Sequence, residues 1–243
     1  MRHIVVLMLV FICYQTANAQ LFKKEKITYD ANQGKGTTDY NLLRWGYFLG
    51  FNNYDFNFDY NEDLRDIYVK RSTGFNVGLI GNLRINNFLD LRLEPGLYMT
   101  TRELHFAESD FPEGGSYTSS DFLREVKSTY IHIPLLLKIS TKRLNNFKPF
   151  IVGGASTALN LSSNEGSRDD NANGQFRSKK NMFFYELGFG IDFYLHNFKF
   201  TPSIRGVFAI NDELVRDKDP NSPWTGNINS MKSRGVFINF TFQ

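Results

Sequence analysis

The chain has 243 residues, a formal charge of +3 and a mean hydropathy of −0.35. So small a charge argues against a nucleic-acid binder, and the length allows one large or two small domains. It contains 24 Phe and 12 Tyr but only 2 Trp. No stretch after residue 14 approaches the roughly 18 apolar residues of a membrane helix, so any membrane segment must use strands.

Residues 1–19 have the pattern of a secretory signal, with a basic start, an apolar run and a small-x-small site that ends at Ala19. We therefore expect Sec-type export and a mature chain that begins at Gln20. The alternative is a buried N-terminal helix. Cys13, the one cysteine, would leave with the signal; lipid attachment there is disfavoured by the bulky residues that precede it. Residues 20–41 are polar and predict a periplasmic N-terminal segment without firm structure.

From residue 43 onward, apolar and polar residues alternate with a period of two, which indicates strands. The pattern is clearest in residues 181–210, where one face of a hairpin is apolar and the other carries Glu186, Asp192 and Arg205. The same pattern predicts eight strands, at residues 43–52, 73–85, 89–99, 129–140, 147–161, 181–195, 198–210 and 235–242.

Short turns and long polar links alternate between these strands. The turns contain Asn86 and Asn87, Asn145 and Asn146, and His196 and Asn197. Asparagine suits such turns because it tolerates left-handed backbone angles. The spacing predicts an all-β fold: an eight-stranded antiparallel up-and-down transmembrane β-barrel at residues 42–243, with short periplasmic turns and long extracellular loops.

Charged residues in these strands fall on the polar face. A cationic side chain facing lipid at mid-depth costs about 2–4 kcal/mol, so a bilayer would enforce this placement. We predict that these charges pair inside the barrel because isolated buried charges are costly. A cation-lined anion pore is the alternative, but eight strands leave little room for water. The predicted luminal ion-pair network comprises Arg44, Arg84, Asp90, Arg92, Glu94, Lys138, Glu186, Asp192 and Arg205.

Four prolines lie inside proposed strands, where each removes a hydrogen bond of the strand ladder. We expect a bulge, or a position near a rim, at Pro95, Pro134, Pro149 and Pro202.

Residues for catalysis or metal binding are few. A lone luminal His132 is more often a packing residue than a base. Asp169, Asn171, Asn173 and Gly174 imitate the start of a calcium loop, but Lys180 stands where the loop needs a bidentate carboxylate. We therefore expect no enzyme activity, no metal and no cofactor.

Aromatic residues in the long loops are the remaining candidates for a site. Phe106, Phe111, Tyr117 and Trp224 are of the kind found exposed at partner contacts. Packing among the loops, or an aromatic girdle near the lipid headgroups, would explain them equally well.

Four segments resemble the PorT family, also called SprT, of Bacteroidota outer membranes. They are Arg44–Asn52 (RWGYFLGFN), Arg102–Phe106 (RELHF), Tyr130–Lys138 (YIHIPLLLK) and Lys148–Ala155 (KPFIVGGA). The third and fourth are shared by many barrels of that phylum and so support the fold more than the role.

Membership would imply a non-enzymatic component of the type IX secretion system, needed for protein secretion and, in gliding species, for gliding motility. Its expected partners are the outer-membrane bilayer and other secretion components, with no nucleic acid and no small-molecule substrate. The alternative is a small passive channel or structural barrel of the wider group.

Overall fold

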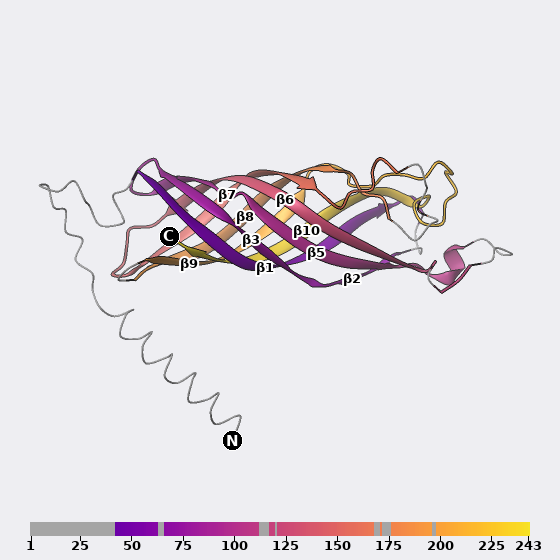
Figure 1. Cartoon of the computed structure of the whole chain (residues 1–243), viewed down its shortest axis with the longest axis horizontal. Helices are drawn as coiled ribbons and strands as arrows, with labels where there is room; N and C mark the ends of the chain where they lie inside the picture. Colours follow the sequence, from indigo (N-terminus) through magenta and orange to yellow (C-terminus); the bar gives the residue numbers. More distant parts are fainter. Residues whose placement is uncertain are drawn as a thin grey trace, which may run out of the picture.

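The computed structural model describes residues 42–62, 66–111, 117–119, 121–167, 171, 176–195 and 198–243 (Figure 1). The predicted signal and N-terminal segment lie outside these residues. One short 3-10 helix, Glu108–Asp110, is present, and no described helix could serve as a membrane span. The strands are β1 (Leu43–Tyr60), β2 (Tyr68–Arg71), β3 (Thr73–Arg84), β4 (Leu89–Leu93), β5 (Gly96–His105), β6 (Leu123–Ser140), β7 (Phe147–Asn160), β8 (Asn181–Tyr194), β9 (Lys199–Ala209) and β10 (Ile228–Phe242).

These strands form one antiparallel sheet that closes on itself. The first strand, β1, pairs with β10 on one side and with β3 on the other, which completes the ring. The ring has eight positions because β2 and β3 share one and β4 and β5 share another. Between β2 and β3, the register against β5 gains one residue at Ser72, as in a β-bulge. The predicted eight-stranded up-and-down barrel is confirmed.

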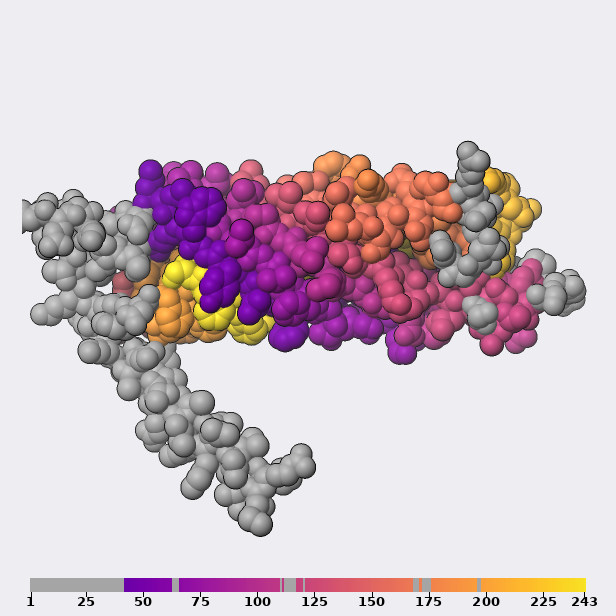
Figure 2. All heavy atoms as spheres, in the orientation of Figure 1, coloured from indigo at the N-terminus to yellow at the C-terminus, as the bar shows by residue number. Residues whose placement is uncertain are grey.

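An apolar belt surrounds the outside of the barrel. Leu79, Leu187 and Phe189 are 62, 62 and 59 % exposed, although burial is the rule for such residues in a soluble fold. Arg92 and Glu186 are 2 and 0 % exposed, because they point inward. Figure 2 shows the cylinder from outside, with the start of β1 (indigo) near one end. Within this belt, the strands therefore carry apolar side chains out and charged ones in.

Several strands run further than the sequence predicted. β1 continues eight residues past the expected end at Asn52, and β6 begins at Leu123 rather than Thr129. The link expected at residues 54–72 thus contains strand residues at both ends. We call the end with the short connections the turn end and the opposite end, where the longer connections lie, the loop end. The barrel extends at the loop end beyond its apolar belt.

The prolines are accommodated largely without bulges. Pro134 lies opposite Glu94, in the gap between β4 and β5, and the register on either side of that gap is the same. The missing N–H of Pro134 therefore falls where the neighbouring strand is already interrupted at Pro95. Pro149 lies beside Thr141, just beyond the end of β6, and thus near the rim. Pro202 is the fourth residue of β9 and keeps regular pairing with Phe240.

Two asparagine turns use different devices. Asn145 has a φ of 54°, the left-handed conformation expected there. Asn86 instead accepts hydrogen bonds on its side-chain oxygen from the backbone N–H groups of Phe88 and Leu89. A side chain that replaces a backbone acceptor stabilises a turn without left-handed angles.

Candidate functional site in the barrel interior

A cluster of paired charges occupies the middle of the barrel. Glu94 binds two arginines, with Oε2 2.7 Å from Arg205 Nη1 and Oε1 3.3 Å from Arg92 Nη1. Glu186 also binds two partners, with Oε2 2.8 Å from Arg205 Nε and Oε1 2.6 Å from His132 Nε2. Arg205, on β9, thus bridges a carboxylate on the neighbouring strand β8 and another between β4 and β5. All five side chains are at most 5 % exposed, so this cluster forms a dry ionic core.

A second pair lies between this cluster and the turn end. Lys138 donates to Asp192, and the hydroxyl of Thr201 donates to the other oxygen of that carboxylate at 2.8 Å. The Lys138 ammonium also lies 4.1 Å from the centre of the Phe150 ring, a cation–π contact. Arg92 stands over the same ring at 5.3 Å. Phe150 thus contacts both charged groups.

Three residues of the predicted network lie elsewhere. Arg44, Arg84 and Asp90 line a cavity at the mouth of the turn end, and the central cluster includes none of them. Arg84 donates to the turn residues Asn86 and Asn87. The structure therefore divides the predicted network into a paired core and a group of three residues at the mouth of the turn end.

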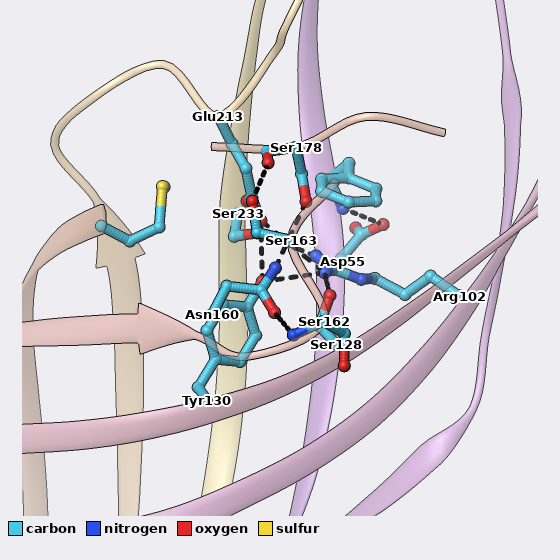
Figure 3. A network of polar contacts seen from close by, with 12 residues as sticks. Asp55, Arg102, Ser128, Tyr130, Asn160, Ser162, Ser163, Ser178, Glu213 and Ser233 are labelled. Atoms are coloured by element: carbon cyan, nitrogen blue, oxygen red, sulfur yellow. Dashed lines mark hydrogen bonds and ion pairs between the residues drawn. The ribbon is translucent and has the colours of Figure 1, made fainter. Parts of the chain in front are cut away.

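A third polar layer on the loop-end side was missed by the sequence analysis (Figure 3). Arg102 donates from Nη1 to Ser233 Oγ at 2.8 Å and from Nη2 to Ser128 Oγ at 2.9 Å. Tyr130 donates to Glu213 Oε1 at 2.7 Å, and the Glu213 carboxylate also accepts from Ser233. Arg102 and Glu213 are fully buried. The strand predicted at residues 89–99 ends before Arg102. Thr101 and Glu103, on either side of it, face outward, so the continued alternation was the signal that Arg102 faces inward.

Glu213 comes from the segment that follows β9, not from a strand. Its backbone N–H donates to Met231 O at 2.8 Å, and its backbone oxygen accepts from Lys179. The segment therefore turns inward and places a carboxylate beneath the loops, where it compensates Arg102. Nothing in the local sequence distinguishes Glu213 from an exposed loop acid.

The loop end has an apolar core of its own, which we call the loop-end cluster. It consists of Phe56, Leu104, Phe106, Phe111, Val126, Phe176, Leu214, Trp224, Ile228 and Met231. Phe106, Phe111 and Trp224 are 7, 7 and 8 % exposed, so the expectation of exposed partner contacts is wrong for these three. Tyr117 is half-buried, with its ring 4.8 Å from that of Phe111. Packing between loops explains their burial, because together they cover the end of the barrel.

Asp217 joins two of the loops above this cluster. Its carboxylate accepts from Arg177 at 2.9 Å, from Ser222 at 2.6 Å and from the backbone N–H of Asn171 at 3.0 Å. The side chain is 2 % exposed. A buried carboxylate with several donors fixes the relative position of the segments that supply them.

Asp121 anchors a further loop. The backbone N–H and the hydroxyl of Thr118 donate to it at 2.8 and 2.9 Å, and these hydrogen bonds hold the pKa of the Asp121 carboxyl below its usual value. Trp224 Nε1 donates to the Asp121 backbone oxygen at 3.1 Å. Asp121 therefore links its loop to the loop-end cluster.

The residues considered for catalysis and metal binding are His132 and the calcium-like motif. His132 is enclosed by Tyr98, Phe184 and Phe237 and is bound to Glu186. Among the described residues, no group of three His, Cys, Asp or Glu side chains is arranged to hold a metal ion. Of the calcium-like motif, Asp169, Asn173 and Gly174 lie outside the described residues.

The family pattern described as "Outer membrane protein beta-barrel domain" matches residues 18–215. Among curated proteins, none matches the sequence.

Similar solved structures include three barrels. Ail of Yersinia pestis in complex with the heparin analogue sucrose octasulfate has 14 % identity, a TM-score of 0.37, and coverage of 82 % of this chain and 96 % of its own. The Neisserial surface protein A has 10 % identity, a TM-score of 0.39, and coverage of 82 and 97 %. AlkL in lipid bilayers has 14 % identity, a TM-score of 0.39, and coverage of 90 and 94 %.

Proposed function

Since this chain belongs to the outer membrane protein beta-barrel domain family, we propose that it is a non-enzymatic outer-membrane component of the type IX protein secretion system. In gliding species it would also serve gliding motility. The proposal includes export through a Sec-type signal at residues 1–19, a periplasmic segment at residues 20–41 and an origin in Bacteroidota. The resemblance of its strand motifs to the PorT family supports this specific role.

The filled interior of the barrel is the observation that supports a non-enzymatic role. Arg205, Glu94 and Glu186 are mutually paired and buried at the centre, and the fully buried Tyr98 and Leu136 occupy the same interior. An eight-stranded barrel is just wide enough for such side chains. A barrel filled in this way acts through its outer surface and its two ends, as expected of a subunit that contacts other proteins.

The PorT-like motifs on β6 and β7 lie side by side. Leu135 pairs with Ala155, and Leu137 with Gly153. An added Cβ on Gly154 would lie 2.2 Å from the backbone oxygen of Leu135, so this glycine permits the close approach of the two strands. These two motifs therefore support the barrel itself. The motif at Arg44–Asn52, on β1, carries the narrower resemblance.

Deletion of the gene followed by complementation tests the role. We expect cargo of the type IX system to remain in the cells of the deletion strain and to return to the medium with the wild-type gene. Resistance to large antibiotics serves as the control for outer-membrane integrity. Normal cargo release in the deletion strain would refute the secretion role and leave a structural barrel.

Conductance in planar bilayers distinguishes the secretion component with a filled interior from the alternative, a small passive channel. The purified barrel should show no ion-conducting steps beyond the lipid background, because the charged core spans the interior. A steady conductance, increased by Arg205→Ala and unchanged by the outward-facing variant Lys127→Ala, would establish a small channel instead.

A further inference from the structure

The mouth of the turn end is a cavity of about 280 Å³ with a strong excess of positive charge. Of the described side chains that line it, six are basic, including Arg44, Lys142 and Lys199, and two are the carboxylates of Asp90 and Asp192. The paired core of the barrel contains no such imbalance, because there each carboxylate binds its cations directly. The cavity thus concentrates positive potential at one end of the barrel.

Lys199 shows how the basic side chains of this cavity outnumber its carboxylates. It is the first residue of β9, lines the cavity and is only 2 % exposed. Its ammonium is attracted electrostatically by the carboxylate of Asp192. That carboxylate also accepts from Lys138 and Thr201, so two lysine side chains share one acid. Positive charge therefore remains in excess at this end of the barrel, and a bound anion would balance it.

We propose that this cavity, which we call the basic mouth, binds a phosphate group. A phosphoryl group carries up to about two negative charges and several acceptor oxygens, which suits several converging cations better than one carboxylate does. Arginine forks and lysine ammoniums are the usual donors to phosphate. Two sources are chemically equivalent here: free phosphate and the headgroup of a phospholipid. This inference does not depend on the secretion role.

The position of the basic mouth is compatible with a phospholipid headgroup as the source of the phosphate. Trp45 and Tyr47, 69 and 53 % exposed, lie on the outside of β1 at the same end of the barrel. Aromatic residues of this kind sit at the level of lipid headgroups. The cavity therefore opens close to the depth at which phospholipid phosphates lie.

Titration of the purified full chain with inorganic pyrophosphate in a neutral detergent tests the site. We expect saturable binding that weakens with added salt. Lys199→Met should reduce the affinity about tenfold or more, since a charge-assisted contact is lost. Lys127→Gln, on the outer face of β6, is the matched control and should bind as the wild type does.

A stability measurement guards against a simple folding defect. Without phosphate, Lys199→Met should unfold at the same or a higher temperature than the wild type, because Lys138 still pairs with Asp192 and one of the crowded positive charges is removed. Native mass spectrometry then distinguishes the sources: a phospholipid retained by the wild type and lost from Lys199→Met identifies a headgroup, and pyrophosphate binding alone identifies free phosphate. Absence of both, or binding unaffected by Lys199→Met, overturns the proposal.

Discussion

The section of the barrel inside the apolar belt and the section at the loop end have opposite polarity. In β1, Leu49 and Phe51 point outward within the belt, and Asn52 points inward. Further along the same strand, Asn57 and Asp59 point outward, while Phe56 is buried. One continuous strand therefore changes from apolar-out to polar-out.

The surrounding medium explains this inversion. Within the belt, lipid tails solvate the outside, so charges must pair in the interior. At the loop end the outside is aqueous: Asp55 pairs there with Arg234 at 2.9 Å, and Lys70 with Glu103 at 3.0 Å. The loop-end cluster then forms an apolar core as in a soluble domain. Paired charges thus stabilise the interior within the belt, and apolar packing stabilises the loop end. Four substitutions test these two contributions separately.

The largest effect is expected in the ionic core. Glu186→Ala leaves His132 without its partner and Arg205 with one carboxylate, and breaking a buried pair costs about 3–5 kcal/mol. Urea unfolding, followed by heat-modifiable migration on gels, measures this loss. Glu125→Ala, whose exposed ion pair with Lys127 lies outside the barrel, should cost no more than about 1 kcal/mol. Similar losses for both variants would contradict a specific role for the core.

The apolar belt is tested by adding a charge to it. Leu187, in the middle of β8, is 62 % exposed, and Leu187→Arg should destabilise the folded barrel in bilayers by about 2–4 kcal/mol. Asn57→Arg places the same charge outward on the loop-end section of β1 and should be nearly neutral. If the two variants unfold alike in lipid vesicles, the boundary of the belt is misplaced.

A smaller, local effect is expected at the loop end. Asp217→Asn removes the charge that Arg177 and Ser222 bind, and should ease the opening of the loops by about 1–3 kcal/mol. Limited proteolysis should then cut the loops faster, with unchanged heat-modifiable migration of the barrel. Asp219→Asn, at an exposed position nearby, is the control and should leave the cleavage rate as it is in the wild type. A barrel that unfolds with its loops would show that the two sections are one cooperative unit.

The smallest effect concerns pH at Asp121. Its folded-state pKa is lowered by Thr118, so the carboxylate stabilises its loop above the unfolded-state pKa of about 3.9. That contribution is lost as the pH falls through the lower, folded-state pKa. The Thr118 amide shift in NMR spectra should follow this titration below pH 4, and Asp121→Asn should abolish it. A midpoint at or above 3.9 would show that the hydrogen bonds do not form in solution.

The strands of the belt could be predicted from the sequence because lipid surrounds all of them and requires apolar side chains on their outer face. Phe75, Val77 and Leu79 alternate with polar residues, and each faces outward as predicted. The strand extension after Asn52 was missed although Tyr54, Phe56, Phe58 and Tyr60 still alternate with polar residues. That alternation was read as a loop because the apolar-out register had ended. A search for alternation of either sign would have found the extension.

The sequence by itself determined the number of barrel strands, their direction and the face of each that meets lipid, because alternation is a local property and lipid excludes charge from one face. Only the tertiary structure decided which charges pair. Arg205 reaches Glu94 from a distant part of the chain, Glu213 enters from a loop to meet Arg102, and Lys199 is left facing the basic mouth. These pairings depend on closure of the ring, which brings side chains together across the interior. The residues next to them in the sequence do not show which charges will pair.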